Sequence, residues 1–496
     1  MSPKIDDDLN FCKIRNSKMH ESYYEYLRTD HPFTFNHKLS FWRKIQILFM
    51  SVLVVPLKFL FGMLFFSLTW FYAFVVSIGI KPNSKHPVGR FRQILINPLR
   101  LLLRLFYFFI GFYWVKVVGK RASSKEAPIL VVCSHSTIFD GILFSLNSPF
   151  PSAVSRIENL NAPFAGAISK AAQLIFVKRE QKSSRKATIE AINNRARSRE
   201  WPQLIIFPEG VITNRSSIVE FKNGPFIPGM PVQPVAIEFL NSWNTVSWVG
   251  ENSKKLKQLF WYSLCQFRLI MKVTYMDVYY PNEEEQNNPK IYASNVRDMF
   301  SSFLNIPCSN ISNEDNKLMK EAKKHGLPYL SGSIGFSELN QTYGLTFEKS
   351  LDLISKFADI SKPTGVINYE MFLSYFKFPN CESAKKVFSM YDYDQKKLID
   401  SIKFFIGRIK YFMVDVEKCK NIFHLMVNKI SQKFDIDQLS FILSQSKDIH
   451  LSKKDVTLLY DKLTTNSLQE VTYDQFELVV LNDPEYLDFF GNLIKN

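Results

Sequence analysis

The chain has 496 residues, 46% of them hydrophobic with 45 phenylalanines, and its formal net charge is +16. This size allows about two or three domains, and the basic charge favours an anionic partner. Because the sequence holds no RNP, zinc-finger or basic-zipper pattern, we exclude nucleic acid and expect an anionic membrane. The six cysteines are scattered without a CxxC pair, which indicates a reducing compartment.

Residues 1–40 are predicted as a polar N-terminal arm, and residues 41–120 as membrane-associated helices. Residues 45–80 are almost wholly apolar, and Phe59–Ile80 is long enough to cross a bilayer. Two alternatives remain open, namely a single transmembrane helix and a hairpin that bends near Pro56. Basic residues on both sides of this stretch favour the hairpin, because positive charge marks the cytoplasmic side.

A second apolar stretch, residues 99–118, carries Arg100, Arg104 and Lys116. We expect an interfacial helix whose basic side chains reach the lipid headgroups. The alternative is a helix buried in a protein core.

Residues 121–305 are predicted to form an α/β domain, because short apolar segments alternate with helical stretches. Several segments are apolar on both faces, as in a covered sheet. The expected strands are ILVVCS, SAVSRI, LIFVKR, QLIIFPE, VQPVAIEF and LIMKVTYMDV. Residues 306–345 are expected to be a linker, and residues 346–496 an all-α second domain.

The first chemical motif lies in VVCSHSTIFDGILF, residues 131–144, where His135 and Asp140 follow an apolar strand. Histidine is suited to accept a proton near neutral pH. A carboxylate bonded to its other ring nitrogen fixes the tautomer and stabilises the imidazolium. The pair works if His135 lies on a turn and Asp140 in the first turn of the following helix. Taken alone, this spacing more often marks a buried histidine and a helix-capping aspartate.

Three later segments add candidate residues. FVKREQKSSRKAT, residues 176–188, offers Arg179, Ser184 and Arg185 as donors to a phosphate, or it forms a solvated basic loop. PVQPVAI, residues 231–237, lines an acyl groove or starts a buried strand. FPEGVITNR follows a strand end and contributes Glu209, Gly210, Asn214 and Arg215.

The second domain contains a degenerate EF-hand-type loop, DYDQKKLIDSIK, at residues 392–403. Asp392, Asp394 and Asp400 stand at positions 1, 3 and 9, but lysines occupy positions 5, 6 and 12, where an oxygen ligand, glycine and glutamate are needed. We therefore expect poor calcium binding. Further helix–loop–helix patterns with fewer acids lie at 364–372, 433–443 and 468–479. They predict a structural or partner-binding module.

Together these segments resemble the glycerophospholipid acyltransferase superfamily, and most closely its EF-hand-containing lysophosphatidylcholine acyltransferases. That branch typically reads FPEGTCTNR where this chain has Phe207–Arg215. It is also similar to FKNGPFIPGMPVQPV and YYPNEEEQNNPKIYASNVR. The resemblance covers roughly residues 40–305 and, more loosely, the C-terminal domain. In the superfamily the HX4D motif is catalytic, and an EG-containing motif helps to bind the acyl acceptor.

The resemblance implies that His135 is the general base and Asp140 its partner. It also implies a set of acceptor or phosphate contacts, namely Arg179, Glu209, Gly210, Asn214 and Arg215. Val211 and Ile212 stand where the branch usually has threonine and cysteine, which puts the acceptor preference in doubt.

The implied function is that of a membrane-bound acyltransferase that converts lysophosphatidylcholine to phosphatidylcholine. Acyl-CoA is the expected co-substrate, with no tightly bound cofactor. The acceptor alternatives are lysophosphatidic acid, and lyso-PAF with acetyl-CoA as donor. A rival of another class is a catalytically dead calcium-sensing adaptor, against which the intact His–Asp pair argues. We expect the endoplasmic reticulum membrane with a cytoplasmic catalytic domain, and lipid droplets as well if the hairpin stays in one leaflet. Acyl-chain length and oligomeric state are left open.

Overall fold

The computed structural model describes residues 31–35, 39–162, 165–178, 182–198, 200–249, 256–410, 416–427, 433–444, 453–464, 470–483 and 485–495. The chain forms two compact units, Met1–Asn313 and Glu314–Asn496.

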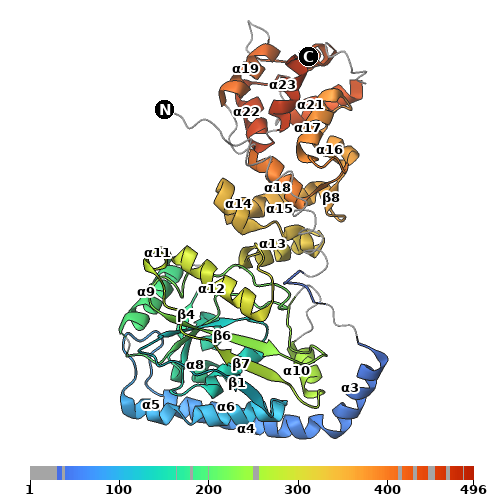
Figure 1. Cartoon of the computed structure of the whole chain (residues 1–496). Helices are drawn as coiled ribbons and strands as arrows, with labels where there is room; N and C mark the ends of the chain where they lie inside the picture. The colour runs from blue at the N-terminus through green and yellow to red at the C-terminus, as the bar shows by residue number, and fades with distance from the viewer. Residues whose placement is uncertain are drawn as a thin grey trace. The chain divides into compact units, whose positions relative to one another are not determined.

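A seven-stranded sheet lies at the centre of the first unit (Figure 1). Its strands are β1 Val115–Val118, β2 Ile129–Cys133, β3 Ser152–Arg156, β4 Ile175–Val177, β5 Leu204–Ile206, β6 Val232–Phe239 and β7 Met271–Tyr275. Their order is β1-β7-β6-β2-β5-β3-β4. Strand β2 is parallel to both β5 and β6, and Val131 is in register with Ile206. The loops that follow β2 and β5 therefore leave the same edge of the sheet.

Each of the six predicted strands is present, and continuous apolar segments such as β2 supply side chains to both faces of the sheet. Leu130 and Val132 of β2 face one core, whereas Ile129, Val131 and Cys133 face another. The first core is shared with the N-terminal helices. The second is covered by α9, Lys182–Ser198, and α12, Pro289–Leu304.

Further helical segments of the first unit lie between the strands after β2 and beyond the last strand, β7. They are η1 Ile138–Ile142, α7 Leu143–Leu146, η2 Ile157–Leu160, α8 Ala165–Ala171, α9 Lys182–Ser198, α10 Leu256–Leu264, α11 Glu283–Asn287 and α12 Pro289–Leu304.

The N-terminal helices are α3 Phe41–Leu53, α4 Val55–Ser77, α5 Arg90–Ile96 and α6 Leu99–Ile110. Helices α4 and α6 pack antiparallel: the rings of Phe61 and Phe65 stack on Phe109, with centroids 5.0 and 5.2 Å away. By length and composition, α4 and the stretch Arg90–Ile110 are each able to cross a membrane.

The chain does not fold back on itself near Pro56, as the predicted hairpin requires. Only Val54 separates α3 from α4, and Pro56 stands in the first turn of α4. Proline is tolerated there because that N–H has no helical partner. The segment that returns along α4 is α5–α6 (Figure 1).

The structure also differs from the predicted helix over residues 99–118. Helix α6 ends at Ile110, and Gly111 follows with φ of 125°, which a residue with a side chain rarely adopts. Residues Val115–Val118, three of them β-branched valines, then form an edge strand, β1, which pairs with β7. Basic Lys116 therefore lies on a sheet edge rather than on a helix.

The second unit is mainly helical. Its helices are α13 Asn313–Lys324, η3 Tyr329–Gly332, α14 Phe336–Tyr343, α15 Phe347–Ser361, α16 Tyr369–Phe376, α17 Glu382–Tyr391, α18 Ser401–Lys410, α19 Val416–Met426, α20 Ile436–Ser444, α21 Lys453–Leu463, α22 Tyr473–Asn482 and α23 Glu485–Lys495. The segment expected to be a linker, 306–345, thus contains α13 and α14. Their apolar residues Leu318, Ala322 and Leu339 belong to the core of this unit.

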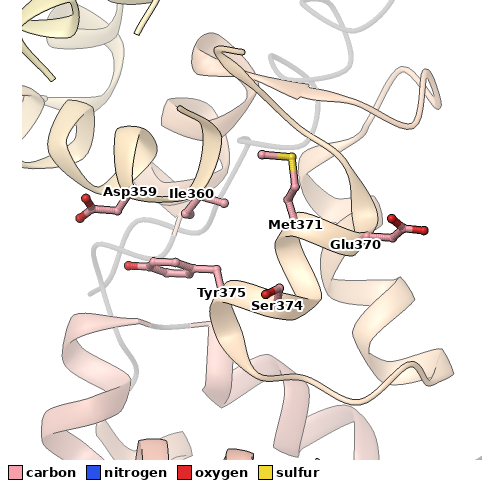
Figure 2. A pocket seen from close by; sticks show the side chains of 6 residues that line it. All are labelled: Asp359, Ile360, Glu370, Met371, Ser374 and Tyr375. Atoms are coloured by element: carbon pink, nitrogen blue, oxygen red, sulfur yellow. The ribbon is translucent and has the colours of Figure 1, made fainter. Parts of the chain in front are cut away.

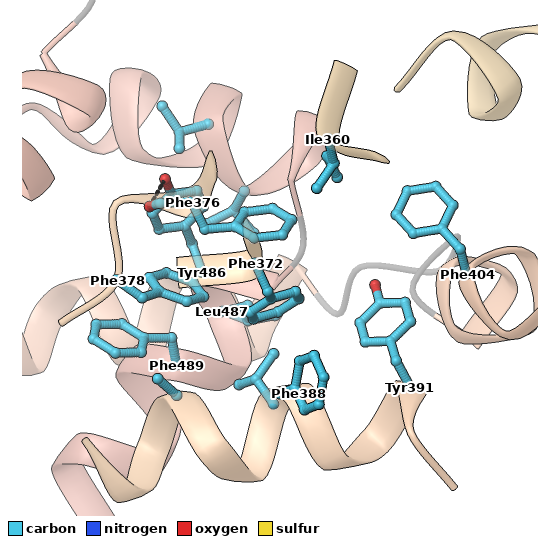
Figure 3. Packing of buried hydrophobic residues seen from close by; sticks show 14 of the residues in the cluster. Ile360, Phe372, Phe376, Phe378, Phe388, Tyr391, Phe404, Tyr486, Leu487 and Phe489 are labelled. Atoms are coloured by element: carbon cyan, nitrogen blue, oxygen red, sulfur yellow. Dashed lines mark hydrogen bonds between the residues drawn. The ribbon is translucent and has the colours of Figure 1, made fainter. Parts of the chain in front are cut away.

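Consecutive helices of the second unit are joined by loops that pair with one another. The short strands β8, Val366–Ile367, and β9, Ile399–Asp400, are antiparallel, and Phe434 forms a similar bridge with Val471. The core is rich in aromatic rings (Figure 3), including the stacked Phe378 and Phe489. The expected helix–loop–helix pattern is therefore present in this unit.

Gly407 provides a test of this packing. Alanine usually favours a helix over glycine by about 1 kcal/mol, but a Cβ at Gly407 would overlap the ring of Tyr391. That ring cannot retreat freely because its hydroxyl is bonded to buried Glu485. We expect Gly407→Ala to destabilise the second unit by about 1–3 kcal/mol, measured as a lower Tm of the detergent-solubilised protein.

The matched control is Ser389→Ala at an exposed position of α17, which should leave Tm nearly unchanged. A Tm for Gly407→Ala equal to that of the wild type would contradict the packing described.

Candidate active site

The structure brings His135 and Asp140 together on the turn between β2 and η1. His135 Nδ1 lies 2.7 Å from Asp140 Oδ2, and the backbone N–H groups of Ser136 and Thr137 donate to the same oxygen over 2.9 and 3.1 Å. Asp140 is buried, and it also occupies position N3 of a capping box whose N-cap residue is Thr137. The carboxylate therefore fixes the ring and leaves Nε2 as the basic nitrogen.

The reactive side of the imidazole remains accessible. The His135 side chain is 25% exposed, whereas Asp140 is 1% exposed. The ring of Phe207 stacks against His135 with centroids 4.2 Å apart. Within the described part of the chain, no hydrogen bond occupies Nε2 of His135. This nitrogen is thus oriented but free to take a proton from a substrate.

The FPEGVITNR segment holds the backbone of His135 from both sides. Glu209 Oε2 accepts a hydrogen bond from the His135 N–H over 2.8 Å, and the Thr213 N–H donates to the His135 carbonyl over 2.8 Å. The parallel register of β2 and β5 makes this contact available.

Glu209 was expected to contact the acceptor, but its side chain is completely buried. Burial raises the pKa of Glu209 to about 8, although the hydrogen bond from His135 acts in the opposite direction. The carboxyl group is thus mostly protonated at neutral pH. Its hydrogen bond helps to fix the backbone of His135.

Gly210 is required by the turn rather than by an approaching ligand. Its φ is 62°, and an added Cβ would lie 3.0 Å from Cε of Lys222. The Gly210 N–H closes the turn on the carbonyl of Phe207. Only glycine adopts this conformation without strain.

Asn214 fastens an N-terminal segment to the site. Its side-chain amide donates to the carbonyls of His31 and Thr34 over 3.0 and 2.7 Å, and its backbone N–H donates to Pro32. Residues 31–35 were predicted to be part of a polar arm, without this contact. Phe33 is an aromatic residue within this polar stretch, which is the sequence signal for such a contact, and in the structure it is 1% exposed.

Arg215 is partly buried near the His–Asp pair. Its guanidinium lies 5.3 Å from the ring centroid of Phe239, and one terminal nitrogen donates to the Phe239 carbonyl. Burial lowers the pKa of Arg215, and the negative charge of Asp140 opposes that shift. This cation can stabilise negative charge that develops beside His135.

The remaining predicted residues have different positions. Arg179 lies outside the described residues. Ser184 Oγ accepts a hydrogen bond from the Lys178 N–H, and Arg185 is exposed on α9. The PVQPVAI segment lies in and just before β6, where buried Gln233 bonds to the carbonyls of Lys120 and Met276. It is a buried strand.

Several buried polar atoms near His135 lack a hydrogen-bond partner among the described residues. They are Ser134 Oγ, Ser136 Oγ, Asp140 Oδ1, Thr213 Oγ1 and Arg215 Nε. Such atoms are rare in a core that serves only stability. Their concentration around one histidine marks this edge of the sheet as the candidate active site.

The second unit has an open cleft of about 450 Å³, lined by Asp359, Ile360, Glu370, Met371, Ser374 and Tyr375 (Figure 2). It offers two carboxylates but no histidine or cysteine. Across the described residues, no cluster of three or more histidine, cysteine, aspartate or glutamate side chains is arranged to hold a metal.

Comparisons with known proteins point to one family. Residues 114–238 match the family model described as Acyltransferase. Lysophosphatidylcholine acyltransferase 2B of Rattus norvegicus is 33% identical over 474 residues, covering 93% of this chain and 90% of its own. Lysophosphatidylcholine acyltransferase 2 of Homo sapiens is 32% identical over 470 residues, covering 92% and 84%. The crystal structure of the acyltransferase PlsC from Thermotoga maritima, at 16% identity, covers 54% of this chain and 99% of its own with a TM-score of 0.35, too low to support a conclusion.

The buried carboxyl group of Glu209 predicts a pH dependence of stability. Its pKa is about 8 in the folded chain against an ordinary value of 4.5, so the folded state binds more protons. Its stabilising contribution is fully present below pH 4.5 and is lost as pH rises through about 8. We expect Glu209→Gln, which keeps an acceptor for the His135 N–H, to flatten the fall of Tm between pH 5 and pH 8.

Exposed Glu283 on α11 supplies the control, since Glu283→Gln should leave the pH profile unchanged. Parallel profiles for the wild type and Glu209→Gln would show that Glu209 is ionised in the folded protein.

Proposed function

Because this chain belongs to the lysophosphatidylcholine acyltransferase family and is an acyltransferase, we propose that it acylates lysophosphatidylcholine to phosphatidylcholine. Acyl-CoA is the donor. The observation that carries the proposal is the 2.7 Å contact between His135 and Asp140 at the carboxyl edge of the sheet. It supplies the base that a glycerol hydroxyl needs to become a nucleophile.

In the proposed reaction, Nε2 of His135 accepts the proton of the free glycerol hydroxyl. The hydroxyl oxygen attacks the thioester carbonyl carbon, and Arg215 lies within electrostatic reach of the charge that develops. The carbon–sulfur bond then breaks, and the CoA thiolate leaves with the proton from His135. Asp140 stabilises the imidazolium during this exchange, so no covalent enzyme intermediate is needed.

We propose that guanidinium and hydroxyl groups of the chain recognise the phosphate of the acceptor. Arg215, Arg179, Ser184 and Arg185 are suited to the phosphate because guanidinium and hydroxyl groups donate to its oxygens. Glu209, Gly210 and Asn214 act instead by shaping the loop. Lysophosphatidic acid, and lyso-PAF with acetyl-CoA, remain alternative substrates, since the His–Asp pair acts on the hydroxyl that all three share.

The test is acyl transfer by purified, detergent-solubilised protein. The acceptors are lysophosphatidylcholine, lysophosphatidic acid and lyso-PAF, each offered with long-chain acyl-CoA and with acetyl-CoA. We expect the highest rate with lysophosphatidylcholine and long-chain acyl-CoA, with a loss of about 10³-fold or more in His135→Ala. Asp140→Asn should lose nearly as much, because an amide no longer stabilises the imidazolium.

His325→Ala, at a histidine that is partly exposed in the second unit, should retain full activity. Wild-type activity in His135→Ala would overturn the catalytic proposal. A higher rate with lysophosphatidic acid or lyso-PAF would leave the mechanism intact and change the substrate.

We also propose that the first unit binds the membrane through the outer faces of α3–α6. Large exposed apolar side chains continue along these helices, including Trp42, Leu48, Phe59, Phe71 and Leu101. Trp114, which is 80% exposed beside the start of β1, adds an aromatic anchor of the kind found at membrane interfaces. We propose an endoplasmic reticulum membrane, with the catalytic domain on the cytoplasmic side. This location is supported by the apolar surface, by the basic residues on both sides of residues 45–80 and by the use of acyl-CoA as the donor. Lipid droplets fit if the helices stay in one leaflet.

Vesicle flotation tests this surface. We expect the double variant Phe59→Asp, Leu60→Asp to lose most of its binding to phosphatidylcholine vesicles containing anionic lipid, because charged groups are costly in the hydrocarbon layer. Phe441→Asp, at an exposed phenylalanine of the second unit, is the control. Equal flotation of both variants would count against this membrane face.

The second unit is proposed to be an EF-hand-like module with degenerate loops that binds a protein partner. Support comes from the paired helix–loop–helix units and from the short antiparallel contacts between their loops. Its loop at 392–403 carries too few oxygen ligands to act as an ordinary calcium site.

A further inference from the structure

The loop between α17 and α18 holds a cation of its own. The ammonium of Lys403 lies 3.0 Å from Asp392 Oδ1 and 2.6 Å from the carbonyl oxygen of Leu398, and it also donates to Asp394 Oδ1. These oxygens come from loop positions 1, 7 and 3. The same three positions provide calcium ligands in a functional EF-hand loop, whose position 12 is a glutamate rather than a lysine.

The rest of the loop is arranged around this cation. The Lys397 N–H at position 6 donates to Asp392 Oδ2 over 2.7 Å, and Lys397 itself has φ of 60°, where glycine is usual. The Asp400 carboxylate at position 9 accepts the N–H of Lys403 over 2.9 Å and caps the first turn of α18. Strand β9 in this loop pairs with β8. The loop is therefore closed and hydrogen-bonded.

The pairing of Lys403 with Asp392 and Asp394 affects stability because these charges are wholly or partly buried. The side chains of Lys403 and Asp392 are 6% and 8% exposed, and that of Asp394 is 30% exposed. Partial burial acts to raise the pKa of Asp394, but its hydrogen bond to Lys403 and the charge of Lys403 outweigh burial and hold that pKa below its ordinary value. Two carboxylates thus face one buried ammonium. Removing that ammonium would leave negative charge buried without a partner, which is costly.

We infer that the ammonium of Lys403 takes the place of a divalent metal ion, so that this loop is closed permanently and without calcium. Calcium does not fit while Lys403 is present. A calcium ion would have to lie about 2.3–2.6 Å from these oxygens, at the point that the ammonium already occupies. Two positive charges at one point would also repel. Conversely, a carboxylate at position 403 would convert the same oxygens into a calcium site.

The loop is joined to the core of the second unit, so the ammonium matters beyond the loop. Tyr391, which immediately precedes Asp392, donates its hydroxyl to buried Glu485. Arg408 of α18 pairs with Glu485 and with Asp483, both over 2.8 Å. Opening the loop would therefore disturb the contact of α17 and α18 with α23. This inference does not rest on the proposed acyl transfer, because binding and unfolding are measured without substrate.

The experiment measures Tm and calorimetric calcium binding of the full chain in detergent, after chelation and then during titration with calcium chloride. The wild type should show no calcium-dependent change in Tm and no binding heat. Lys403→Met should have a lower Tm that calcium does not restore. Lys403→Glu should also have a lower Tm without calcium, but one that rises by several degrees as calcium is added.

A second variant, Lys396→Asp with Lys403→Glu, adds the missing ligand at position 5 and should bind calcium more tightly than the single variant. Lys362→Glu makes the same charge change at an exposed lysine of the same unit and should show neither effect. The inference fails if calcium raises the Tm of the wild type. It also fails if Lys403→Met is as stable as the wild type, or if neither glutamate variant gains stability with calcium.

Discussion

The candidate active site depends on the fixed backbone of His135. Its N–H is held by Glu209 and its carbonyl by the Thr213 N–H, so two loops that are far apart in the chain act as one. This clamp exists because parallel strands β2 and β5 end side by side. Without it, the contact between His135 and Asp140 would rest on a single short turn. The sheet thus positions His135, the proposed base, through main-chain atoms, and the carboxylate of Asp140 orients its side chain.

The sequence predicted the fold best where consecutive residues of a strand are all buried. The six predicted strands are short β-branched and aliphatic segments, and their apolar pattern specifies a sheet with two covered faces. Strand β1 was missed because Leu99–Val118 reads as a single apolar run, and only the φ of Gly111 breaks it. The turn at Pro56 was expected to reverse the chain, yet proline is equally suited to the first turn of a helix. A local pattern does not distinguish these outcomes, which tertiary contacts decide.

The candidate site was predicted in its residues more fully than in their roles. His135 and Asp140 are adjacent because the spacing matches a strand, a turn and a capped helix. Glu209 and Asn214 were predicted to contact the acceptor, since polar residues in a motif suggest a ligand, and in the structure their side chains bond to the protein backbone. Burial decides between the two, and burial of a polar side chain is not visible in a linear sequence. Lys403 shows the converse: its type excluded an ordinary metal site, but only the structure reveals its position among the oxygens.

The contact between Asn214 and residues 31–34 has a practical consequence for handling this protein. The stretch just before the first apolar helix is attached to the loop that carries Arg215 and supports His135. Removal of residues 31–34 would therefore take away hydrogen bonds that hold this loop, although the two stretches are remote in sequence. A shortened form intended for crystallisation should begin before His31.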